Sequence, residues 1–343
     1  MSRFIELKRS IVLLLAIALP ACGQSASKPM QTGDSAVNGV LIKALIIDGQ
    51  NNHTDWPKTT VMMRQILENT GKFSVDVART ATTWKGKLCN EFPLGDGVER
   101  KDHRKPQADP NYRPEFSAYD VVISNFGNAA ADWPAETKAD FEKYIAEGGG
   151  LVVVHAADNS WGDWKAFNEM IGLGGWGNRD GSAGTYAYFD EEGNEQRDDK
   201  KGKVGGHGPQ HEYQVVTRNA DHPIMKGLPK AWLHAKDELY QYLRGPAENM
   251  TILATSYANP KKKGTGRHEP TVMVLDYKKG RVFHTPLGHA GYSFECVGLQ
   301  TLLIRGTEWA ATGNVTSEVP KEFPTDKKSL SVTFELKKEV MAK

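Results

Sequence analysis

The feature that most constrains the fold of this chain is residues 148–158, GGGLVVVHAAD. Three glycines end a helix-like segment, and the four apolar residues after them predict a strand that is buried on both faces. The strand stops at His155, and Asp158 follows closely. In open parallel α/β sheets, ligands bind at the carboxyl ends of strands, so both side chains lie where a site is expected. A hydrolase of related design would place Ser or Cys at this elbow, where this chain has His.

Strand patterns alternate with helix patterns along the first half of the chain. Strands are predicted over 41–48, 73–77, 119–125 and 151–155, with helices from Pro57 and over 135–148. This alternation predicts a doubly wound, mostly parallel sheet. The second half is richer in strands, predicted over 212–217, 250–256, 271–277 and 281–285, and a helix over 296–311 closes the domain. The polar stretches 95–114 and 190–203 are expected to be solvated loop insertions, and 329–336 an added edge strand.

The amino-terminal residues predict export. A basic start and an apolar run over 11–19 have the pattern of a signal peptide over 1–21. The run closes on Leu-Pro-Ala-Cys22, which resembles a bacterial lipobox, and 22–39 has the composition of a flexible tether. We therefore expect a lipid anchor at Cys22 that holds the chain on a membrane facing the periplasm. A secreted protein, cut from an ordinary signal peptide nearby, is the alternative.

The remaining organisation is one α/β domain over 40–313 and a carboxyl-terminal extension over 314–343. A net charge of +1 gives no reason to expect a nucleic-acid partner. Membrane contact is expected only through the lipid anchor. Cys89 and Cys296 could pair in an oxidising compartment or stay unrelated thiols. The oligomeric state stays open, with a homo-oligomer among the alternatives.

Histidines and carboxylates recur at predicted strand ends. His53 follows the first strand, Asp237 and Glu238 precede Tyr240, and His289 follows the strand at 281–285. Imidazole suits proton transfer and metal ligation, and carboxylates supply a base or a hard ligand. The chain has no HExxH, CxxC, P-loop or GxSxG motif, so no single spacing identifies the chemistry. Each of these residues taken alone is equally consistent with a hydrogen-bonded structural role.

Aromatic residues form a second pattern in the same segments, namely Trp56, Trp161, Trp164, Trp176 and Tyr240. Flat aromatic faces beside hydrogen-bonding groups suit a sugar, because a pyranose has an apolar face and a hydroxyl rim. Core tryptophans beneath long loops are the alternative explanation.

The order of these motifs resembles the trehalose-utilisation ThuA family. The resemblance rests on GQNNHTDWP (49–57), YDVVISN (119–125), GGGLVVVHAADNSW (148–161), DHPIMKGLP (221–229), DELYQ (237–241), GRVFHTPLGH (280–289) and GTEWAATG (306–313). It implies a flavodoxin-like fold of the class I glutamine amidotransferase type, a three-layer α/β sandwich without that group's catalytic Cys. It also implies a role in sugar catabolism, in several systems on 3-keto-glycosides. The family's motif positions correspond here to His53, His155, Asp158, Asp237, Glu238 and His289.

Two functional hypotheses follow. In the first, the protein is an enzyme that acts on a keto-sugar or 3-keto-glycoside by general acid/base chemistry. Its catalytic residues are then His155, Asp158 and Glu238, and its substrate-binding residues are His53, Trp56, Asp237, Tyr240 and His289. A divalent metal held by His53 and His289 is an open cofactor choice. In the second, the protein is a non-catalytic carbohydrate-binding lipoprotein. Amidotransferase or peptidase activity would need a Cys at the elbow, which neither Cys89 nor Cys296 provides.

Overall fold

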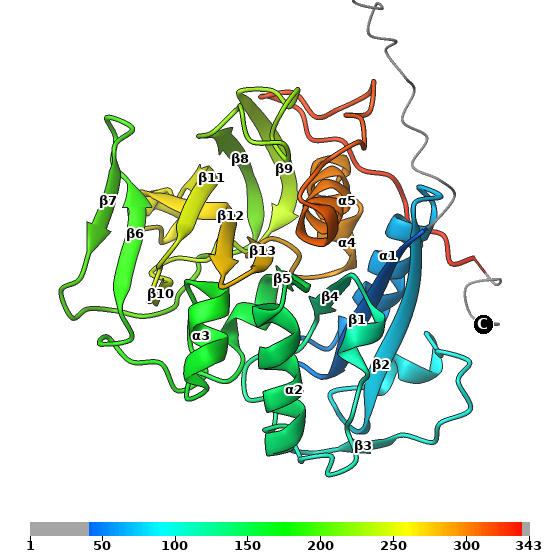
Figure 1. Cartoon of the computed structure of the whole chain (residues 1–343). Coiled ribbons are helices and arrows are strands. Elements are labelled where there is room, and N and C mark those ends of the chain that lie inside the picture. Colours follow the sequence, from blue (N-terminus) through cyan, green and yellow to red (C-terminus); the bar gives the residue numbers. More distant parts are fainter. Residues whose placement is uncertain (1–40, 338–343) are drawn as a thin grey trace, which may run out of the picture. The chain divides into compact units, whose positions relative to one another are not determined.

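The computed structural model describes residues 41–337 (Figure 1). The predicted signal peptide over 1–21, Cys22 and the tether over 22–39 lie outside the described residues. So do residues 338–343 at the end of the predicted extension. Across the described part of the chain, no helix is long and apolar enough to cross a membrane.

The first half of the chain forms the alternating elements that the sequence predicts, with one short strand and one short helix in addition. They are β1 (Ile42–Gln50), α1 (Trp56–Glu68), β2 (Phe73–Trp84), β3 (Lys101–His103), β4 (Val121–Ser124), α2 (Ala135–Ala146), β5 (Gly150–Val154) and α3 (Lys165–Ile171). Pro57 lies in the first turn of α1, where its missing N–H costs nothing. β4 and β5 are buried at every position, as strands covered on both faces by helices must be.

The second half adds strands around the helix α5 (Val297–Thr312). The strands are β6 (Thr185–Phe189), β7 (Glu195–Asp198), β8 (His211–Thr217), β9 (Ala231–Asp237), β10 (Arg244–Gly245), β11 (Met250–Tyr257), β12 (His268–Tyr277) and β13 (Gly280–Thr285), and the short helix α4 (Gly291–Phe294) precedes α5. The sequence patterns did not predict α3, α4, β6, β9 or β10. They also assigned β3 and β7 to solvated loops, whereas β3 pairs in parallel with β2 and β7 pairs with β6 in an antiparallel hairpin.

All thirteen strands belong to one sheet, whose main path is β3-β2-β1-β4-β5-β13-β12-β11-β8-β9. The pairs from β3 to β13 are parallel, and those from β13 to β9 are antiparallel. Because direction alternates along the antiparallel part, β9 runs the same way as β13. The carboxyl ends of β1, β5, β13 and β9 therefore all point to one edge.

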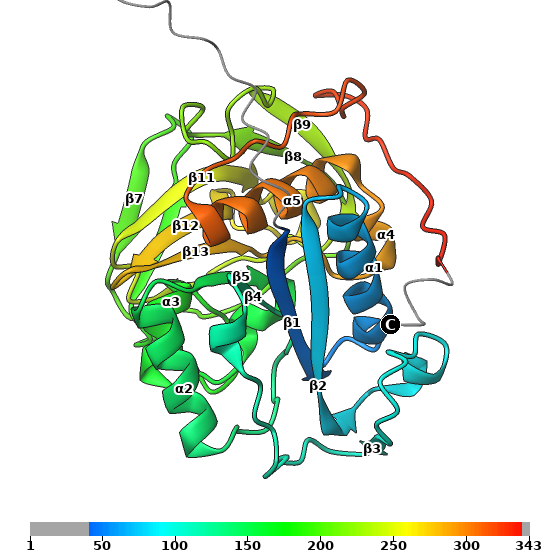
Figure 2. The same cartoon turned by 45° about the vertical axis from the view of Figure 1, so that its right-hand side comes forward.

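Helices cover both faces of this sheet (Figures 1 and 2). One core lies beneath α1, α4 and α5 and contains Met62, Leu67, Phe294 and Leu302. The other lies beneath α2 and α3 and contains Phe141 among others. The result is the expected three-layer α/β sandwich with a central, mostly parallel sheet.

The helix α5 lies unusually close to the sheet because small residues face it. A Cβ on Gly306 would lie 2.4 Å from the Phe283 ring, and one on Gly298 would lie 2.2 Å from Trp232. Real Cβ contacts do not reach such distances. Glycine is therefore required at both positions for the helix to bury β13 and β9 beneath it.

The carboxyl-terminal extension corrects one prediction. Residues 329–336 do not form an edge strand and make only an isolated bridge between Ser331 and Cys296. The carboxyl-terminal extension instead packs, without regular structure, against the core beneath α1, α4 and α5. Its Phe323 ring lies edge-on to Trp232 of β9, with the ring centroids 5.6 Å apart. The Gln65 side chain of α1 then donates to the Glu335 carbonyl at 2.7 Å. Hydrogen bonds to side chains such as this one replace the regular backbone pairing that a β-strand requires.

Two further sequence expectations are decided by the structure. Cys89 and Cys296 are both free, so of the two alternatives the structure shows unrelated thiols. The stretch 95–114 is only partly solvated, because Tyr112 is buried and packs against Phe126 and Trp133. One aromatic residue is therefore enough to anchor this otherwise polar insertion to the second core.

Candidate functional site

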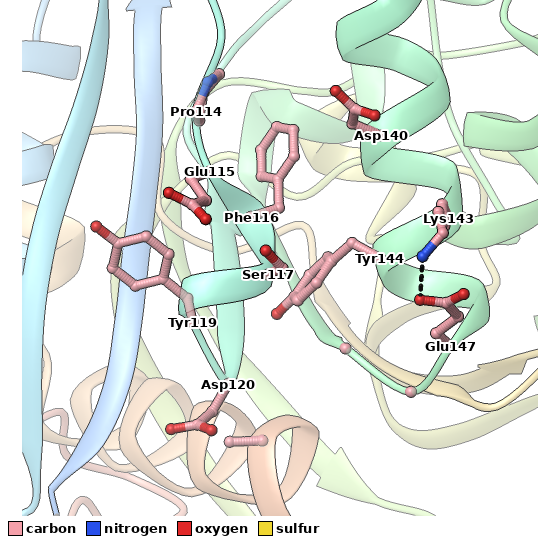
Figure 3. Close-up of a pocket in the computed structure, with 13 residues that line it drawn as sticks. Pro114, Glu115, Phe116, Ser117, Tyr119, Asp120, Asp140, Lys143, Tyr144 and Glu147 are labelled. Atoms are coloured by element: carbon pink, nitrogen blue, oxygen red, sulfur yellow. Dashed lines mark hydrogen bonds and ion pairs between the residues drawn. The ribbon is translucent and has the colours of Figure 1, made fainter.

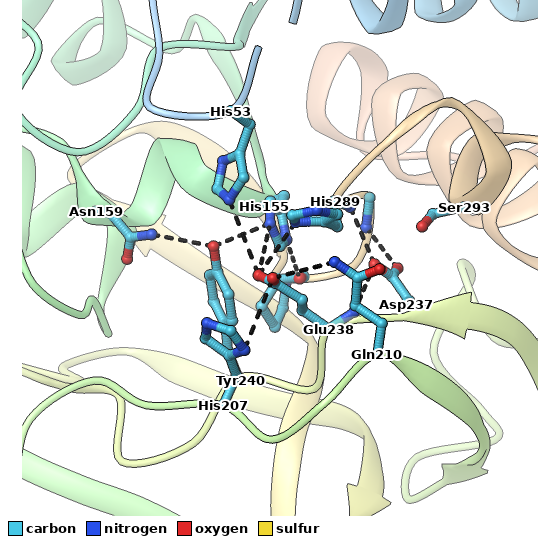
Figure 4. A network of polar contacts seen from close by, with 12 residues as sticks. His53, His155, Asn159, His207, Gln210, Asp237, Glu238, Tyr240, His289 and Ser293 are labelled. Carbon is cyan, nitrogen blue, oxygen red and sulfur yellow. Dashed lines mark hydrogen bonds and ion pairs between the residues drawn. The ribbon is translucent and has the colours of Figure 1, made fainter. Parts of the chain in front are cut away.

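The carboxyl ends of four strands bring a group of titratable side chains together (Figure 4). His53 follows β1, His155 follows β5, His289 follows β13 and Glu238 follows β9. One nitrogen of each imidazole and one oxygen of the Glu238 carboxylate lie within 4.8 Å of one another. These four residues are called the His3Glu cluster below.

His155 occupies a strained elbow directly after β5. Its backbone φ is +47°, in the left-handed region that non-glycine residues rarely adopt. Its Nδ1 lies 2.8 Å from the Pro286 carbonyl oxygen, which can only accept, so Nδ1 carries the proton. Nε2 is then an acceptor, and the Tyr240 hydroxyl lies 2.9 Å from it. The elbow and its neighbours thus point one imidazole lone pair into the cluster.

His53 is oriented by Asn51 in a similar way. The Asn51 amide donates to the carbonyls of Asn125 and Phe126, both at 3.1 Å, so its oxygen must face His53. That oxygen accepts the His53 backbone N–H at 2.9 Å and lies 3.2 Å from Nδ1 of the ring. Nδ1 is therefore the protonated nitrogen, and Nε2 faces Glu238 at 3.9 Å.

Asp237 lies beneath the cluster and holds the backbone of its residues through hydrogen bonds. Its side chain is fully buried, and its carboxylate accepts the backbone N–H groups of Glu238, Gly288 and His289 at 2.8 to 3.0 Å. His234 Nε2 lies 2.8 Å from the same carboxylate. Asp237 therefore fixes the backbone of two cluster residues and does not face the space where a substrate would bind.

Glu238 lies at the centre of the polar contacts. Its Oε2 is 3.1 Å from His289 Nδ1 and 3.7 Å from His155 Nε2. Its Oε1 is 3.7 Å from His207 Nδ1 and 3.5 Å from the Gln210 amide nitrogen. The Glu238 carboxylate thus contacts the buried imidazoles through Oε2 and the more exposed residues His207 and Gln210 through Oε1.

The protonation states follow from burial and mutual repulsion. Burial, together with the neighbouring His155 and His289, lowers the pKa of His53 to about 2, and burial lowers the pKa of His155 as well. Burial opposes ionisation of Glu238, but the surrounding imidazoles outweigh it and lower its pKa to about 2. At neutral pH His53 and His155 are therefore neutral imidazoles, and Glu238 is a carboxylate anion.

Besides Asp237, the structure places two more predicted site residues away from the cluster. Asp158 is fully buried, and its carboxylate lies 3.3 Å from His284 Nε2, not against His155. Trp56 is 1% exposed, donates its Nε1–H to the Trp84 carbonyl at 3.0 Å and stacks under Arg79. These two side chains stabilise the loops around the site but do not reach its centre.

The aromatic pattern is likewise divided. Trp161 and Trp164 pack with Trp133 in the second core. Trp176 is partly exposed, and its ring meets Tyr240 edge-on at 5.0 Å. Of the five predicted aromatic residues, Tyr240 and Trp176 are thus the two that adjoin the cluster.

A rim of polar residues was not selected from the sequence. His207 has 38% of its side chain exposed beside Glu238. Gln210 accepts a hydrogen bond from the Tyr292 hydroxyl at 2.5 Å. The histidines of HGPQH at 207–211 are the sequence signal that could have indicated this rim. Their spacing does not show that the segment lies beside the carboxyl end of β9.

The pocket in Figure 3 lies at the other end of the sheet. It measures about 670 Å³ and is lined by residues that precede β4 and β5, among them Tyr119, Asp120 and Tyr144. The hydroxyls of both tyrosines are engaged, with Asp76 at 3.1 Å and the Gly150 carbonyl at 3.4 Å. It contains neither His nor Cys, so the candidate chemistry lies at the His3Glu cluster.

Comparison with known proteins agrees with this architecture. The sequence model of the ThuA family, described as trehalose utilisation, matches residues 102–310. The chain belongs to the ThuA family. A ThuA-like protein from Parabacteroides merdae is 41% identical, with a TM-score of 0.75 over 85% of this chain and 98% of that one. Membership gives this protein a role related to trehalose utilisation and carbohydrate metabolism.

A second ThuA-like structure, from Bacteroides uniformis, is 19% identical and covers 80% of this chain and 93% of that one, with a TM-score of 0.47. No curated protein matches the chain. The family model and the Parabacteroides merdae structure confirm the family resemblance seen in the sequence motifs and the fold of the class I glutamine amidotransferase type.

Proposed function

We propose that this ThuA protein is a carbohydrate-processing enzyme of sugar catabolism that acts on a keto-sugar or 3-keto-glycoside. The observation that carries the proposal is the His3Glu cluster, in which residues from four strand ends converge beside Tyr240. Family membership supports the sugar class, and the cluster supports acid/base chemistry on a carbonyl compound.

The chemistry follows from what a ketone requires. Removal of a proton from the carbon next to a ketone moves the bond electrons into the carbonyl, which becomes an oxyanion. The reaction therefore needs a base and a group that stabilises the oxyanion. Reprotonation at the neighbouring carbon then gives an isomer, whereas loss of a glycosidic oxygen from the β-carbon cleaves a 3-keto-glycoside.

The cluster and its rim can divide these roles. The Tyr240 hydroxyl is a buried donor that can stabilise an oxyanion directly, whereas the imidazole lone pairs can do so only through a divalent cation. His207 lies at the exposed rim, with Nδ1 2.9 Å from the Gly208 carbonyl oxygen, so its Nε2 is free to accept a proton. Glu238 connects the two parts, since it lies between His155 and His207.

The test is turnover of 3-keto-trehalose and simple 3-keto-glucosides, followed by NMR in D₂O. The native protein is expected to exchange the proton next to the ketone for deuterium and to release product. Glu238→Gln and His155→Ala should each lower the rate by about 100-fold or more, the usual effect of removing a group that acts in the transition state. Glu248→Gln, which alters an exposed carboxylate, is the matched control and should leave the rate unchanged.

Unchanged turnover in His155→Ala would contradict the assignment of this site. Calorimetry on the same samples separates the proposal from a carbohydrate-binding role without catalysis. Binding of the sugar with neither exchange nor product would overturn the enzyme hypothesis in favour of that alternative.

A further inference from the structure

We propose that the His3Glu cluster is a centre for one divalent transition-metal ion, bound by His53 Nε2, His155 Nε2, His289 Nδ1 and Glu238 Oε2. Three imidazole nitrogens and one carboxylate oxygen are a donor set that suits zinc and its neighbours in the first transition row. The binding itself is independent of the proposed function, whereas the ion's role as an electrophile rests on it.

The spacing of the donor atoms fits such an ion. A tetrahedral zinc ion with bonds of about 2.1 Å separates its donors by roughly 3.4 Å. From Glu238 Oε2, the distances to His289 Nδ1, His155 Nε2 and His53 Nε2 are 3.1, 3.7 and 3.9 Å. Shifts of a few tenths of an ångström suffice for these three pairs, whereas donors that lie up to 4.8 Å apart elsewhere in the cluster must approach by about an ångström.

His289 provides an independent observation. Its Nδ1 is buried and lies 3.1 Å from Glu238 Oε2, but in the described residues it makes no hydrogen bond of good geometry. A cation between the imidazole and the carboxylate would satisfy both groups at once.

The surroundings orient the donors as ligands are oriented in metal sites. A ligating His generally donates its other N–H to a carbonyl or carboxylate oxygen, which fixes the tautomer. His155 does so to Pro286, and His53 faces the Asn51 side-chain oxygen in the same way. Asp237 accepts the backbone N–H groups of Glu238 and His289, so it fixes the remaining two donors.

Before His155 Nε2 can bind an ion, the Tyr240 hydroxyl must give up its hydrogen bond to that nitrogen. Asn159 can offer the hydroxyl another acceptor. The Tyr240 oxygen and the Asn159 amide are 3.1 Å apart. With the amide oxygen turned to Tyr240, it accepts the phenol proton, while the amide nitrogen donates to Asp158 at 2.6 Å. The phenol therefore has another acceptor, and the lone pair of His155 becomes available at little cost.

The open side of the centre indicates the ligand class. His155 and Glu238 are 4% and 7% exposed, whereas His207 on the rim is 38% exposed, so a substrate reaches the ion past His207 and Gln210. A ketone oxygen and a neighbouring hydroxyl of one sugar ring can chelate an ion from that side. The ion would then polarise the ketone and stabilise the oxyanion that forms on proton removal.

The test uses the purified protein after treatment with a chelator. Titration with Zn²⁺ in a calorimeter is expected to give one site per chain, and Co²⁺ should produce the visible absorption of a four- or five-coordinate ion. His53→Ala and Glu238→Gln should each weaken Zn²⁺ binding by at least 100-fold. His222→Ala should retain it, because His222 lies outside the donor set.

Failure of the native protein to bind Zn²⁺ or Co²⁺ at micromolar concentration would overturn the metal centre, and this measurement does not depend on how any variant folds. Equal affinity in His53→Ala and Glu238→Gln would overturn it too. Full turnover of keto-glycosides by metal-free protein would remove the metal centre and leave the proposed function standing. Stoichiometric metal binding without turnover would support the centre and count against the proposed function.

Discussion

At the residue scale, His155 links backbone strain to chemistry. A non-glycine residue in the left-handed region costs on the order of 1 kcal/mol or more, and such residues gather at functional sites. In a hydrolase elbow the same strain exposes a nucleophile. Here it directs an imidazole Nε2 to the point where His53, His289 and Glu238 also converge. The geometry of the elbow is thus retained, while the side chain that it presents has changed.

Asp237 gives the first residue-scale prediction. In Asp237→Asn, one carboxylate oxygen becomes an NH₂ group that faces backbone N–H donors, so at least one hydrogen bond is lost and two donors oppose each other. We expect a loss of about 3 kcal/mol in the free energy of unfolding and a 10- to 100-fold loss of Zn²⁺ affinity. Urea unfolding and calorimetry measure the two effects.

Asp163→Asn is the control, because Asp163 is exposed and lies outside the cluster. Native stability in Asp237→Asn would show that this carboxylate does not hold the strand ends together.

Glu269 gives a prediction on pH. It is 1% exposed, and burial raises its pKa to about 7, despite hydrogen bonds from Tyr186 and Thr265 at 2.5 and 2.7 Å. The native state thus binds the proton more tightly than the unfolded chain, whose pKa is about 4.3. Stability from this group is full below the unfolded pKa and is lost as the pH rises through 7.

We expect the native protein to lose roughly 2 kcal/mol of this contribution between pH 5 and pH 8. In Glu269→Gln this part of the pH dependence should vanish. Urea unfolding of both proteins at the two pH values measures it, and parallel pH profiles would contradict the assignment.

At the element scale, the antiparallel half of the sheet completes the site. His53, His155 and His289 come from β1, β5 and β13, which lie close together in the parallel part. Glu238 and Tyr240 come from the end of β9, which is the last strand of the path. The carboxyl end of β9 reaches the cluster because the sheet curves around α4 and α5. At the contact with α5, Trp232 of β9 packs on Gly298. The helix packing therefore determines whether the carboxylate meets the imidazoles.

The contact between α5 and β13 is tested by Gly306→Ala. In an unhindered helix this change stabilises by up to about 1 kcal/mol. Here the new Cβ would lie 2.4 Å from the buried Phe283 ring, so we expect a net destabilisation of about 1 to 3 kcal/mol. Thermal and urea unfolding measure it, with Thr312→Ala at the exposed end of α5 as control. A stability gain would show that the helix is free to move away from the sheet.

At the scale of the whole molecule, the described residues form one compact unit. The carboxyl-terminal extension closes this unit, because the Leu233 N–H of β9 donates to the Thr325 carbonyl at 2.7 Å and α1 contacts Glu335. The extension thus joins the strand that supplies Glu238 to the first helix of the fold.

Anchoring of the whole chain is a proposal that rests on its amino-terminal sequence. We propose that Cys22 is lipidated and that the tether holds the domain at a membrane facing the periplasm. In a bacterial host, the native chain should fractionate with membranes and incorporate labelled fatty acid, and Cys22→Ser should do neither. Equal release of both proteins to the soluble fraction would favour an ordinary signal peptide.

Most of the parallel sheet and part of the site could be predicted from the sequence. Continuous apolar runs such as 151–154 identify buried strands, and the ends of parallel strands meet at one edge, so His53, His155 and His289 were expected near one another. Asp158 and Trp56 were assigned to the site because they adjoin these motifs. Sequence proximity does not determine direction, and both side chains turn toward buried partners.

The sequence by itself determined the strand–helix alternation, the family and the elbow at His155. The family's motif positions also grouped Asp237 and Glu238 with the three imidazoles, and only the tertiary structure decided that Glu238 faces them while Asp237 lies beneath. The physical reason is that β9 was not evident as a strand, since its buried His234 is stabilised by Asp237 and not by an apolar pattern. Its position also depends on the curvature of a sheet packed on α5, which local sequence patterns do not specify.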